Sequence, residues 1–283
     1  MATRLLTLFC VATWLLPAAL AAQPYPAISP IPKTINWSSK PNIDAGKTPP
    51  RIAIIIDDLG YQWPNAKALI NLDAPLTLAI IPFTPYGKKI AEHAQQHQKE
   101  VMVHIPMAPI NHRELGSNWE HSLNNDMDQQ AFDETLKDML DDIPHSQGVN
   151  NHGGSALTQN EEAMSWLMNK LEERALYFVD SRTTANSVAY AAAKRINIPV
   201  AARDVFLDNE RDPQSIVRQL QKLSRIALQH GRAIGIGHPY DETLAALANH
   251  LDDYKAMGIE VVVASELTNR YSPTLAQSQT TAP

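Results

Sequence analysis

The chain has 283 residues, a formal net charge of −6 and a single cysteine. It contains no run of basic residues, which argues against nucleic-acid binding. The cysteine, Cys10, lies in a segment that we expect to be removed, so the mature protein would have neither disulfides nor a thiolate nucleophile or thiolate-bound zinc. Any metal would then be held by histidine, aspartate, glutamate or asparagine.

The amino-terminal residues predict a secretory signal peptide over 1–21. Arg4 supplies a positive charge, residues 5–16 form an apolar stretch, and Ala19 and Ala21 fit a cleavage site just after Ala21. An uncleaved membrane anchor is the alternative, although the apolar stretch is short for a bilayer span of about 20 residues. Either way, we expect a periplasmic or secreted protein without stable membrane insertion after cleavage.

Composition divides the rest of the chain into three parts. Residues 22–50 are rich in proline and polar residues and predict an arm or linker, and residues 269–283 predict a disordered tail. Residues 51–268 are enough for one large α/β domain.

Within this domain, β-branched apolar runs alternate with segments of helical periodicity. In chain order the pattern predicts strand 52–56, helix 64–71, strand 76–81, helix 87–98, strand 101–105, helix 129–142, strand 148–151, helix 160–174, strand 176–179, helix 187–195, strand 199–202, helix 213–229, strand 233–237, helix 241–257 and strand 260–263. Strict alternation indicates parallel strands with right-handed crossovers. We therefore predict a distorted (β/α) barrel of about seven to eight mostly parallel strands, with a doubly wound open sheet as the alternative.

Most of the predicted strands end in residues that bind metals or move protons. The candidates are Asp57 and Asp58, His104, Asn150 to His152, Asp180, and His238. The carboxyl ends of parallel strands lie on one face of a sheet or barrel, where active sites are built. The sequence therefore predicts that these side chains meet at one mouth.

The residue types indicate metal-assisted acid–base chemistry. Adjacent carboxylates such as Asp57 and Asp58 at a buried strand end repel each other, and a bound cation resolves this if one of them ligates it while the other stays free as a base. Neutral histidine is a good ligand for zinc or nickel, which makes His104 and His152 further candidate ligands. His238 is a candidate general acid or ligand.

Three further residues are candidates for roles around that centre. Asp180 could hold a histidine tautomer or bind substrate hydroxyls, and Arg182 could stabilise a developing oxyanion, although a structural Asp180–Arg182 pair is an equal alternative. Either Asn150 or Asn151 could orient substrate or a ligand, and we select Asn151 with Arg182 as substrate-binding residues. Arg203, Asp204 and Asp208 follow another strand and are weaker candidates.

Six ordered blocks resemble the divergent polysaccharide deacetylase family. They span residues 54–60, 103–109, 148–155, 178–183, 205–208 and 233–239. That family is similar in fold to NodB-type carbohydrate esterases, which use a distorted (β/α) barrel and a divalent metal, often zinc.

The resemblance implies roles for single residues. Asp57 matches the general base, Asp58 a metal ligand, His104 the first histidine ligand and His238 the general acid. Asp180 lies near the family's fourth, acid-containing motif. The pattern departs at Ala108, which stands where a second histidine ligand is expected, so a site rebuilt from Asp58, His152 and either His104 or His238 is implied.

We therefore expect an exported, metal-dependent hydrolase that deacetylates an acylated polysaccharide, with a peptidoglycan-type envelope glycan as the natural substrate class and zinc as the expected metal. The alternative is a glycan-binding or envelope-assembly protein that retains the fold without catalysis. A phosphoester hydrolase is disfavoured because few basic residues lie near the strand ends.

Overall fold

The computed structural model describes residues 48–111 and 121–268. The predicted signal peptide, most of the predicted arm and the predicted tail lie outside these ranges and stay predictions. Within the two ranges, no helix has both the length and the apolar character needed to cross a membrane.

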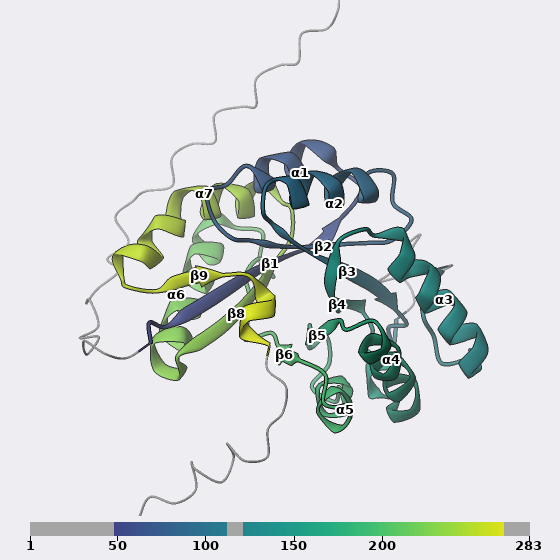
Figure 1. Ribbon diagram of the computed structural model, residues 1–283. Coiled ribbons are helices and arrows are strands. Elements are labelled where there is room, and N and C mark those ends of the chain that lie inside the picture. Colours follow the sequence, from purple (N-terminus) through teal and green to yellow (C-terminus); the bar gives the residue numbers. More distant parts are fainter. Residues whose placement is uncertain (1–47, 112–120, 269–283) are drawn as a thin grey trace, which may run out of the picture. The chain divides into compact units, whose positions relative to one another are not determined.

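Strands and helices alternate along the described chain (Figure 1). The strands are β1 (Arg51–Leu59), β2 (Thr77–Ile80), β3 (Glu100–Met107), β4 (Ser146–Gly153), β5 (Tyr177–Asp180), β6 (Val200–Ala202), β7 (Val205–Phe206), β8 (Arg232–Gly237) and β9 (Glu260–Val262). The helices are α1 (Trp63–Ile70), α2 (Gly87–Gln96), α3 (Gln129–Asp142), α4 (Glu161–Glu173), α5 (Ala189–Ile196), α6 (Pro213–His230) and α7 (Asp241–Ala256), with short 3₁₀ turns η2 (Leu157–Gln159) and η3 (Ala264–Leu267).

All predicted strands and helices are present, and the differences are in the strands. Strand β7 was not predicted, because two residues are too short to show a hydrophobic period. Strands β1, β3 and β4 run further than predicted, so that Asp58 and His152 lie within strands rather than after them.

The sheet is parallel throughout and has the strand order β6-β5-β4-β3-β2-β1-β8-β7, with β9 paired to the start of β1. Its two terminal strands, β6 and β7, are separated in the chain by only Arg203 and Asp204. A linker of two residues spans at most about 10 Å, so the two ends of the sheet must curl toward each other. This arrangement confirms the distorted barrel and excludes the doubly wound sheet, whose outer strands lie far apart.

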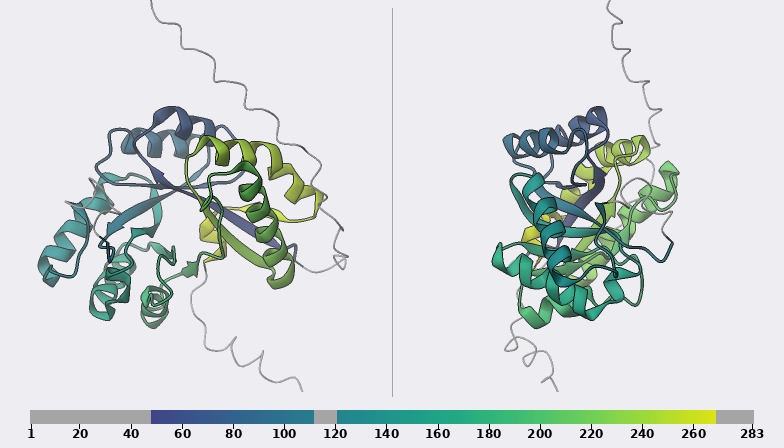
Figure 2. Two further views of the ribbon diagram at one scale, coloured as in Figure 1. Left: turned by 180° about the vertical axis from the view of Figure 1, so that it is seen from behind. Right: turned by 90° about the vertical axis from the view of Figure 1, so that its right-hand side faces the viewer.

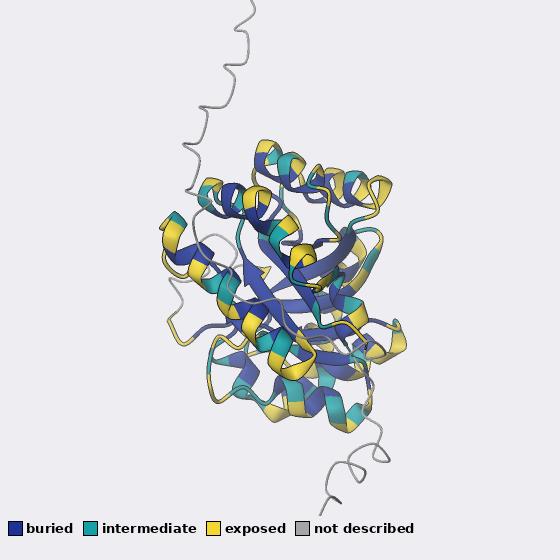
Figure 3. Cartoon of the chain, turned by 90° about the vertical axis from the view of Figure 1, so that its left-hand side faces the viewer, coloured by how far each residue is buried: buried dark blue, intermediate teal, exposed yellow. Residues whose placement is uncertain are grey.

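Alternation along the strands creates two apolar clusters, one on each face of the sheet. Ile52, Ile54 and Ile56 of β1 pack with the helices, which cover the outer face of the curled sheet (Figure 2). Ala53 and Ile55 belong to the smaller interior cluster. The strands are accordingly buried, whereas the helices expose their outward sides (Figure 3).

A buried carboxylate closes the interior at the amino ends of the strands. Glu100 Oε1 accepts hydrogen bonds from the Thr77 hydroxyl at 2.9 Å, the Tyr177 hydroxyl at 2.7 Å and the Ser265 backbone N–H at 3.2 Å. The Ala264 N–H donates to Thr77 Oγ1 at 2.8 Å, which fixes η3 across this end. Polar chemistry is therefore left to the opposite, carboxyl-terminal end of the barrel.

Replacing Tyr177 tests the contribution of this network to stability. We expect Tyr177→Phe to lower the free energy of unfolding by about 1.5–3 kcal/mol, because it removes a hydrogen bond to a buried carboxylate. Tyr254→Phe is the matched control, since Tyr254 is also buried but donates to the Leu220 carbonyl at 3.0 Å, and should cost about 1 kcal/mol. Equal losses in urea unfolding of the two variants would contradict this role for Glu100.

Candidate metal and acid–base site

The candidate residues form the uppermost layer of the barrel interior. Five of them continue the inward-facing series of their strands: Asp57 after Ile55, His104 after Met102, Asn150 and His152 after Gly148, and His238 after Ile236. In a strand, every second side chain points to the same face. The interior face therefore carries apolar side chains in its middle and polar ones at its carboxyl-terminal end.

Asp58 joins this layer through an irregularity in β1. Its backbone is left-handed, with φ of 58°, and the pairing of β1 with β2 shifts register between Ile56 and Leu59. Aspartate is one of the few residues besides glycine that visits this conformation. The irregularity lets two consecutive carboxylates approach the same site, which a regular strand would point to opposite faces.

Asp58, His104 and His152 converge on one point. Asp58 Oδ1 lies 2.8 Å from His152 Nδ1 and 3.2 Å from His104 Nε2, and the two ring nitrogens are 3.2 Å apart. Among the described residues, these three form the only group of metal-ligating side chains that meet within 4.8 Å. Asp58 Oδ1 is buried yet receives no well-directed hydrogen bond. Two ring nitrogens and an unsatisfied carboxylate oxygen form a donor set that fits a divalent metal such as zinc.

Asn150 fixes which nitrogen of His104 faces that point. Its Oδ1 lies 2.7 Å from His104 Nδ1, and its Nδ2 donates to Asp57 Oδ1 at 2.7 Å. An amide oxygen only accepts, so His104 Nδ1 carries a proton and Nε2 is the nitrogen that faces the cluster, where it would offer its lone pair to a bound metal. One fully buried side chain thus sets both the tautomer of a candidate ligand and the orientation of the candidate base.

The two neighbouring carboxylates have opposite pKa shifts. Burial raises the pKa of Asp57, and the attraction of His104 and His238 and the hydrogen bond from Asn150 only partly offset it. Burial would also raise the pKa of Asp58, but His104 and His152 together hold it well below its usual range. Asp57 is therefore suited to accept a proton, and Asp58 to remain an anionic ligand.

His238 is held by a second carboxylate, Asp208. His238 Nδ1 lies 2.8 Å from Asp208 Oδ1, while the His238 backbone N–H and the Thr243 hydroxyl both donate to Oδ2. Burial alone would lower the pKa of His238, but Asp208 and the nearby Asp58 and Asp57 raise it to about 9. Its Nε2 lies 3.7 Å from Asp58 Oδ2, so a protonated imidazole faces the cluster at neutral pH.

Three predicted residues do not join the cluster. The side chain of Asn151 points outward, as that of Val149 does. Its amide nitrogen donates to the Gly153 carbonyl at 2.8 Å, and its amide oxygen accepts from the Ser181 N–H at 2.9 Å. Asn150 is therefore the asparagine that faces the site. Asp180 follows the outward-facing Phe178, and its carboxylate accepts from the Arg182 N–H at 2.8 Å and the Ser187 hydroxyl at 2.8 Å, which stabilises the turn after β5.

Arg182 has a left-handed backbone, with φ of 50°, and lines a separate hollow beside α5. Catalytic or substrate-binding roles for Asp180 and Arg182 stay predictions. Arg203, by contrast, lies near enough to Asp57 for the two charges to attract, and its Nε donates to the Ser181 carbonyl at 2.7 Å.

Asp208, Arg203 and Thr243 are the residues that sequence reasoning undervalued or missed. The sequence places Arg203 and Asp208 only after a predicted strand, and because β7 between them was not predicted, their approach to Asp57 and His238 was not predicted either. Thr243 lies in the first turn of α7, where a threonine has no distinguishing signal in the sequence. Asp208 was indicated only by its position after a predicted strand and by the block 205–208 that resembles the family.

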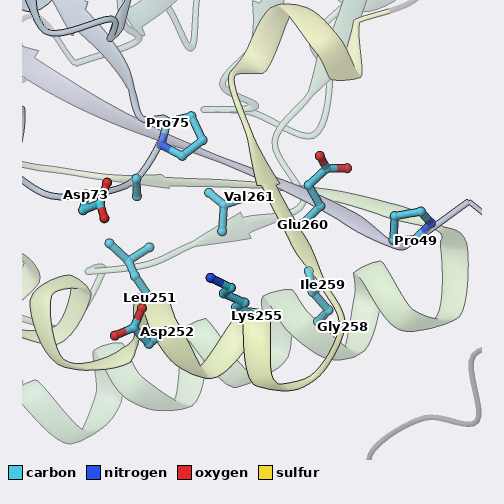
Figure 4. Close-up of a pocket in the computed structure, with 11 residues that line it drawn as sticks. Pro49, Asp73, Pro75, Leu251, Asp252, Lys255, Gly258, Ile259, Glu260 and Val261 are labelled. Atoms are coloured by element: carbon cyan, nitrogen blue, oxygen red, sulfur yellow. The ribbon is translucent and has the colours of Figure 1, made fainter.

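Another hollow, of about 460 Å³, lies at the amino-terminal ends of β1 and β9 (Figure 4). Asp73, Asp252, Lys255 and Glu260 line it together with apolar side chains, and it includes no histidine. It lies at the end of the strands remote from the cluster and is lined by none of the residues that form the cluster.

The fold and the site together define an α/β-barrel protein with a candidate metal centre at the carboxyl ends of its parallel strands. The family model for divergent polysaccharide deacetylase matches residues 54–268. The chain therefore belongs to the divergent polysaccharide deacetylase family.

The chain is also similar to three uncharacterized proteins. An uncharacterized protein of Escherichia coli, YibQ, is 32% identical over 219 residues, which cover 77% of this chain and 67% of the relative. An uncharacterized protein of Haemophilus influenzae is 33% identical over 197 residues, which cover 70% of this chain and 69% of the relative. The crystal structure of an uncharacterized protein of Agrobacterium tumefaciens is similar, with a TM-score of 0.74, 27% identity, and coverage of 79% of this chain and 91% of that one.

The Asp208–His238 pair predicts a pH dependence of stability in protein treated with a chelator. The pKa of His238 is raised from the usual 6.5 to about 9, so its stabilisation is complete below about pH 6.5 and is lost as the pH rises through 9. We expect the free energy of unfolding to fall across this window by at most about 3 kcal/mol. Asp208→Asn should flatten the slope, measured by urea unfolding at intervals of pH, and an unchanged slope would contradict the assignment.

Proposed function

We propose that the protein is a metal-dependent hydrolase that removes acyl groups from a polysaccharide. The observation that carries this proposal is the convergence of Asp58 Oδ1, His104 Nε2 and His152 Nδ1 between a buried carboxylate and a second histidine. Asp57 Oδ2 lies 3.7 Å from His104 Nε2, and His238 Nε2 lies 3.7 Å from Asp58 Oδ2. A general base and a general acid thus flank one candidate metal position.

Asp58, His104 and His152 would hold the metal, with zinc as the proposed ion. A divalent metal in such a site polarises the acyl carbonyl and makes its bound water more acidic. The donor set of two nitrogens and one oxygen leaves room for further ligands, as catalytic zinc sites require.

The protein's own groups would move the protons. Burial raises the pKa of Asp57, which suits it to act as the base. Asp57 takes a proton from the attacking water as the water oxygen bonds to the acyl carbon. His238, protonated at neutral pH because its pKa is about 9, donates a proton from Nε2 to the departing amine or alcohol as the acyl bond breaks. Asp208 holds the ring of His238 in place and stabilises its charge.

Membership of the family supports a glycan as substrate, and the predicted signal peptide supports a periplasmic or secreted location. A peptidoglycan-type envelope polymer is the substrate class we propose. The second candidate is a glycan-binding protein without turnover. Ala108 favours it, because this residue stands where the family resemblance implies a histidine ligand.

Metal analysis tests the ligand set directly. Purified protein incubated with zinc should retain about one equivalent after desalting, because three donors converge on one point. Asp58→Ala and His152→Ala should lose most of it, whereas His230→Ala, which changes an exposed histidine at the end of α6, should not. Retention of zinc by both cluster variants would place the metal elsewhere.

Hydrolysis tests the acid and the base. Asp57→Asn and His238→Ala should each lower kcat by about 10²–10⁴-fold, as loss of a general acid or base does, while zinc stays bound. The measurement is acetate release from N-acetylglucosamine oligomers and from purified peptidoglycan. Undiminished release by both variants would refute the mechanism, and tight oligomer binding without release by the wild-type protein would select the second candidate.

A further inference from the structure

All large hydrophobic side chains that are exposed in the described ranges lie at one place in the fold. They are Tyr61 at 43%, Phe83 at 47%, Tyr86 at 40% and Ile110 at 70% exposure. Tyr61 follows β1, Phe83 and Tyr86 follow β2, and Ile110 follows β3, which are three adjacent strands of the sheet. The four residues therefore gather at the carboxyl-terminal end of the barrel, beside the cluster that Asp58 and His104 help to form.

The backbone at Phe83 is unusual. In the described ranges, non-glycine residues with positive φ fall into two groups. Four of them, Gln98, His145, Ala175 and Asn197, stand within three residues of the end of a helix, where a left-handed residue is common. The other three, Asp58, Phe83 and Arg182, stand at the carboxyl ends of β1, β2 and β5.

A bulky aromatic residue rarely adopts this conformation, and Phe83 does so at φ of 61° while leaving its side chain exposed. Packing in the core therefore does not account for the strain. Strained residues at a strand end point to a functional constraint.

Contacts of the backbone hold together the segments that carry the three aromatic residues. The Tyr86 N–H donates to the Gly60 carbonyl at 2.9 Å, which ties the segment after β2 to the residue before Tyr61. A Cβ at Gly60 would come within 2.1 Å of Thr84 Oγ1, so these two segments are in direct contact. The Phe83 N–H donates to Asp142 Oδ2 at 2.7 Å, which anchors the strained residue to the end of α3.

We propose that Tyr61, Phe83 and Tyr86 form a platform that binds pyranose rings of the polysaccharide next to the acylated residue. The proposal rests on the proposed function, which places a glycan at this mouth. The electron-rich face of an aromatic ring attracts the C–H groups on the apolar face of a pyranose, and a fixed platform loses little conformational entropy on binding. Strand β2 supplies no ligand to the metal cluster, and its end supplies two of the three rings.

Calorimetry tests the platform without turnover. It measures binding of N-acetylglucosamine oligomers and cello-oligosaccharides, of one to six residues, to the full chain. We expect affinity to rise with oligomer length in at least one series. Phe83→Ala and Tyr86→Ala should each weaken binding of the longer oligomers by about tenfold, as loss of one aromatic contact does. Ile110→Ala, which removes a more exposed apolar side chain at the next strand end, should have little effect.

Phe83→Gly separates binding from folding. Glycine accepts positive φ without strain, so this variant should unfold at the same temperature as the wild-type protein or higher and still lose oligomer binding. Phe83→Tyr should retain binding because it keeps the ring. Wild-type affinity in the alanine and glycine variants, or no binding of either oligomer series by the wild-type protein, would overturn the platform.

Turnover distinguishes the platform from the proposed function. If the hydrolase proposal holds, platform variants should raise KM for oligomers far more than KM for an acetylated monosaccharide, whereas Asp57→Asn should lower kcat on both substrates. If the wild-type protein binds oligomers in a Phe83-dependent way but releases no acetate, the platform stands and the hydrolase proposal fails.

Discussion

Repulsion between two adjacent carboxylates at the buried end of β1 is the constraint on which the site depends. Asp57 and Asp58 differ because one residue leaves regular strand geometry: the left-handed backbone at Asp58 turns its carboxylate toward two imidazoles, while Asp57 continues inward toward Asn150. Burial then raises the pKa of the first, and the imidazoles lower that of the second. A single irregular residue thus separates a base from a ligand although the two are consecutive in sequence.

The side chain of Glu100, at the other end of the same barrel, has a structural role. Glu100 Oε1 accepts hydrogen bonds from two hydroxyls and a backbone N–H at the amino-terminal end of the interior. Asp58 Oδ1, at the other end, faces two ring nitrogens and receives no well-directed donor. An apolar layer that includes Ile55 and Met102 lies between them. Glu100 Oε2 is likewise buried without a hydrogen-bond partner. The two ends therefore differ in what surrounds the carboxylate: Glu100 meets hydroxyls and a backbone N–H, whereas Asp58 meets two ring nitrogens.

Some residues of the site could be predicted from the local sequence, whereas others depend on how the strands pair. Asp57, His104 and His238 follow apolar runs, so their strands and the common end of those strands could be predicted from the hydrophobic pattern of the sequence. The choice of Asn150 over Asn151 depends on which residue of β4 faces inward, and that is fixed by the pairing of His104 with Asn150 rather than by local sequence. A shift of one residue reverses the two faces of a strand.

The outward direction of Asp180 has the same cause, since it continues the series of Phe178. Asp208 depends on a different limit. Its strand, β7, has two residues and exists because the curled sheet brings it beside β8, a contact between Val205 and Gly235 that is distant in sequence. Hydrophobic periodicity predicts strands and helices whose own residues favour that structure. Strand β7 forms instead because it pairs with β8, so its own sequence does not predict it.

The replacement of an expected histidine by Ala108 also has a geometric reason. Strand β3 remains extended as far as Met107, so a side chain four residues after His104 would lie about 13 Å away and could not meet it. The strand next to it can supply the ligand instead. His104 pairs with Asn150, and His152 is the next residue of β4 on the same face, which places it diagonally across from His104. A ligand from the adjacent strand, His152 of β4, thus takes the place of one from the same segment.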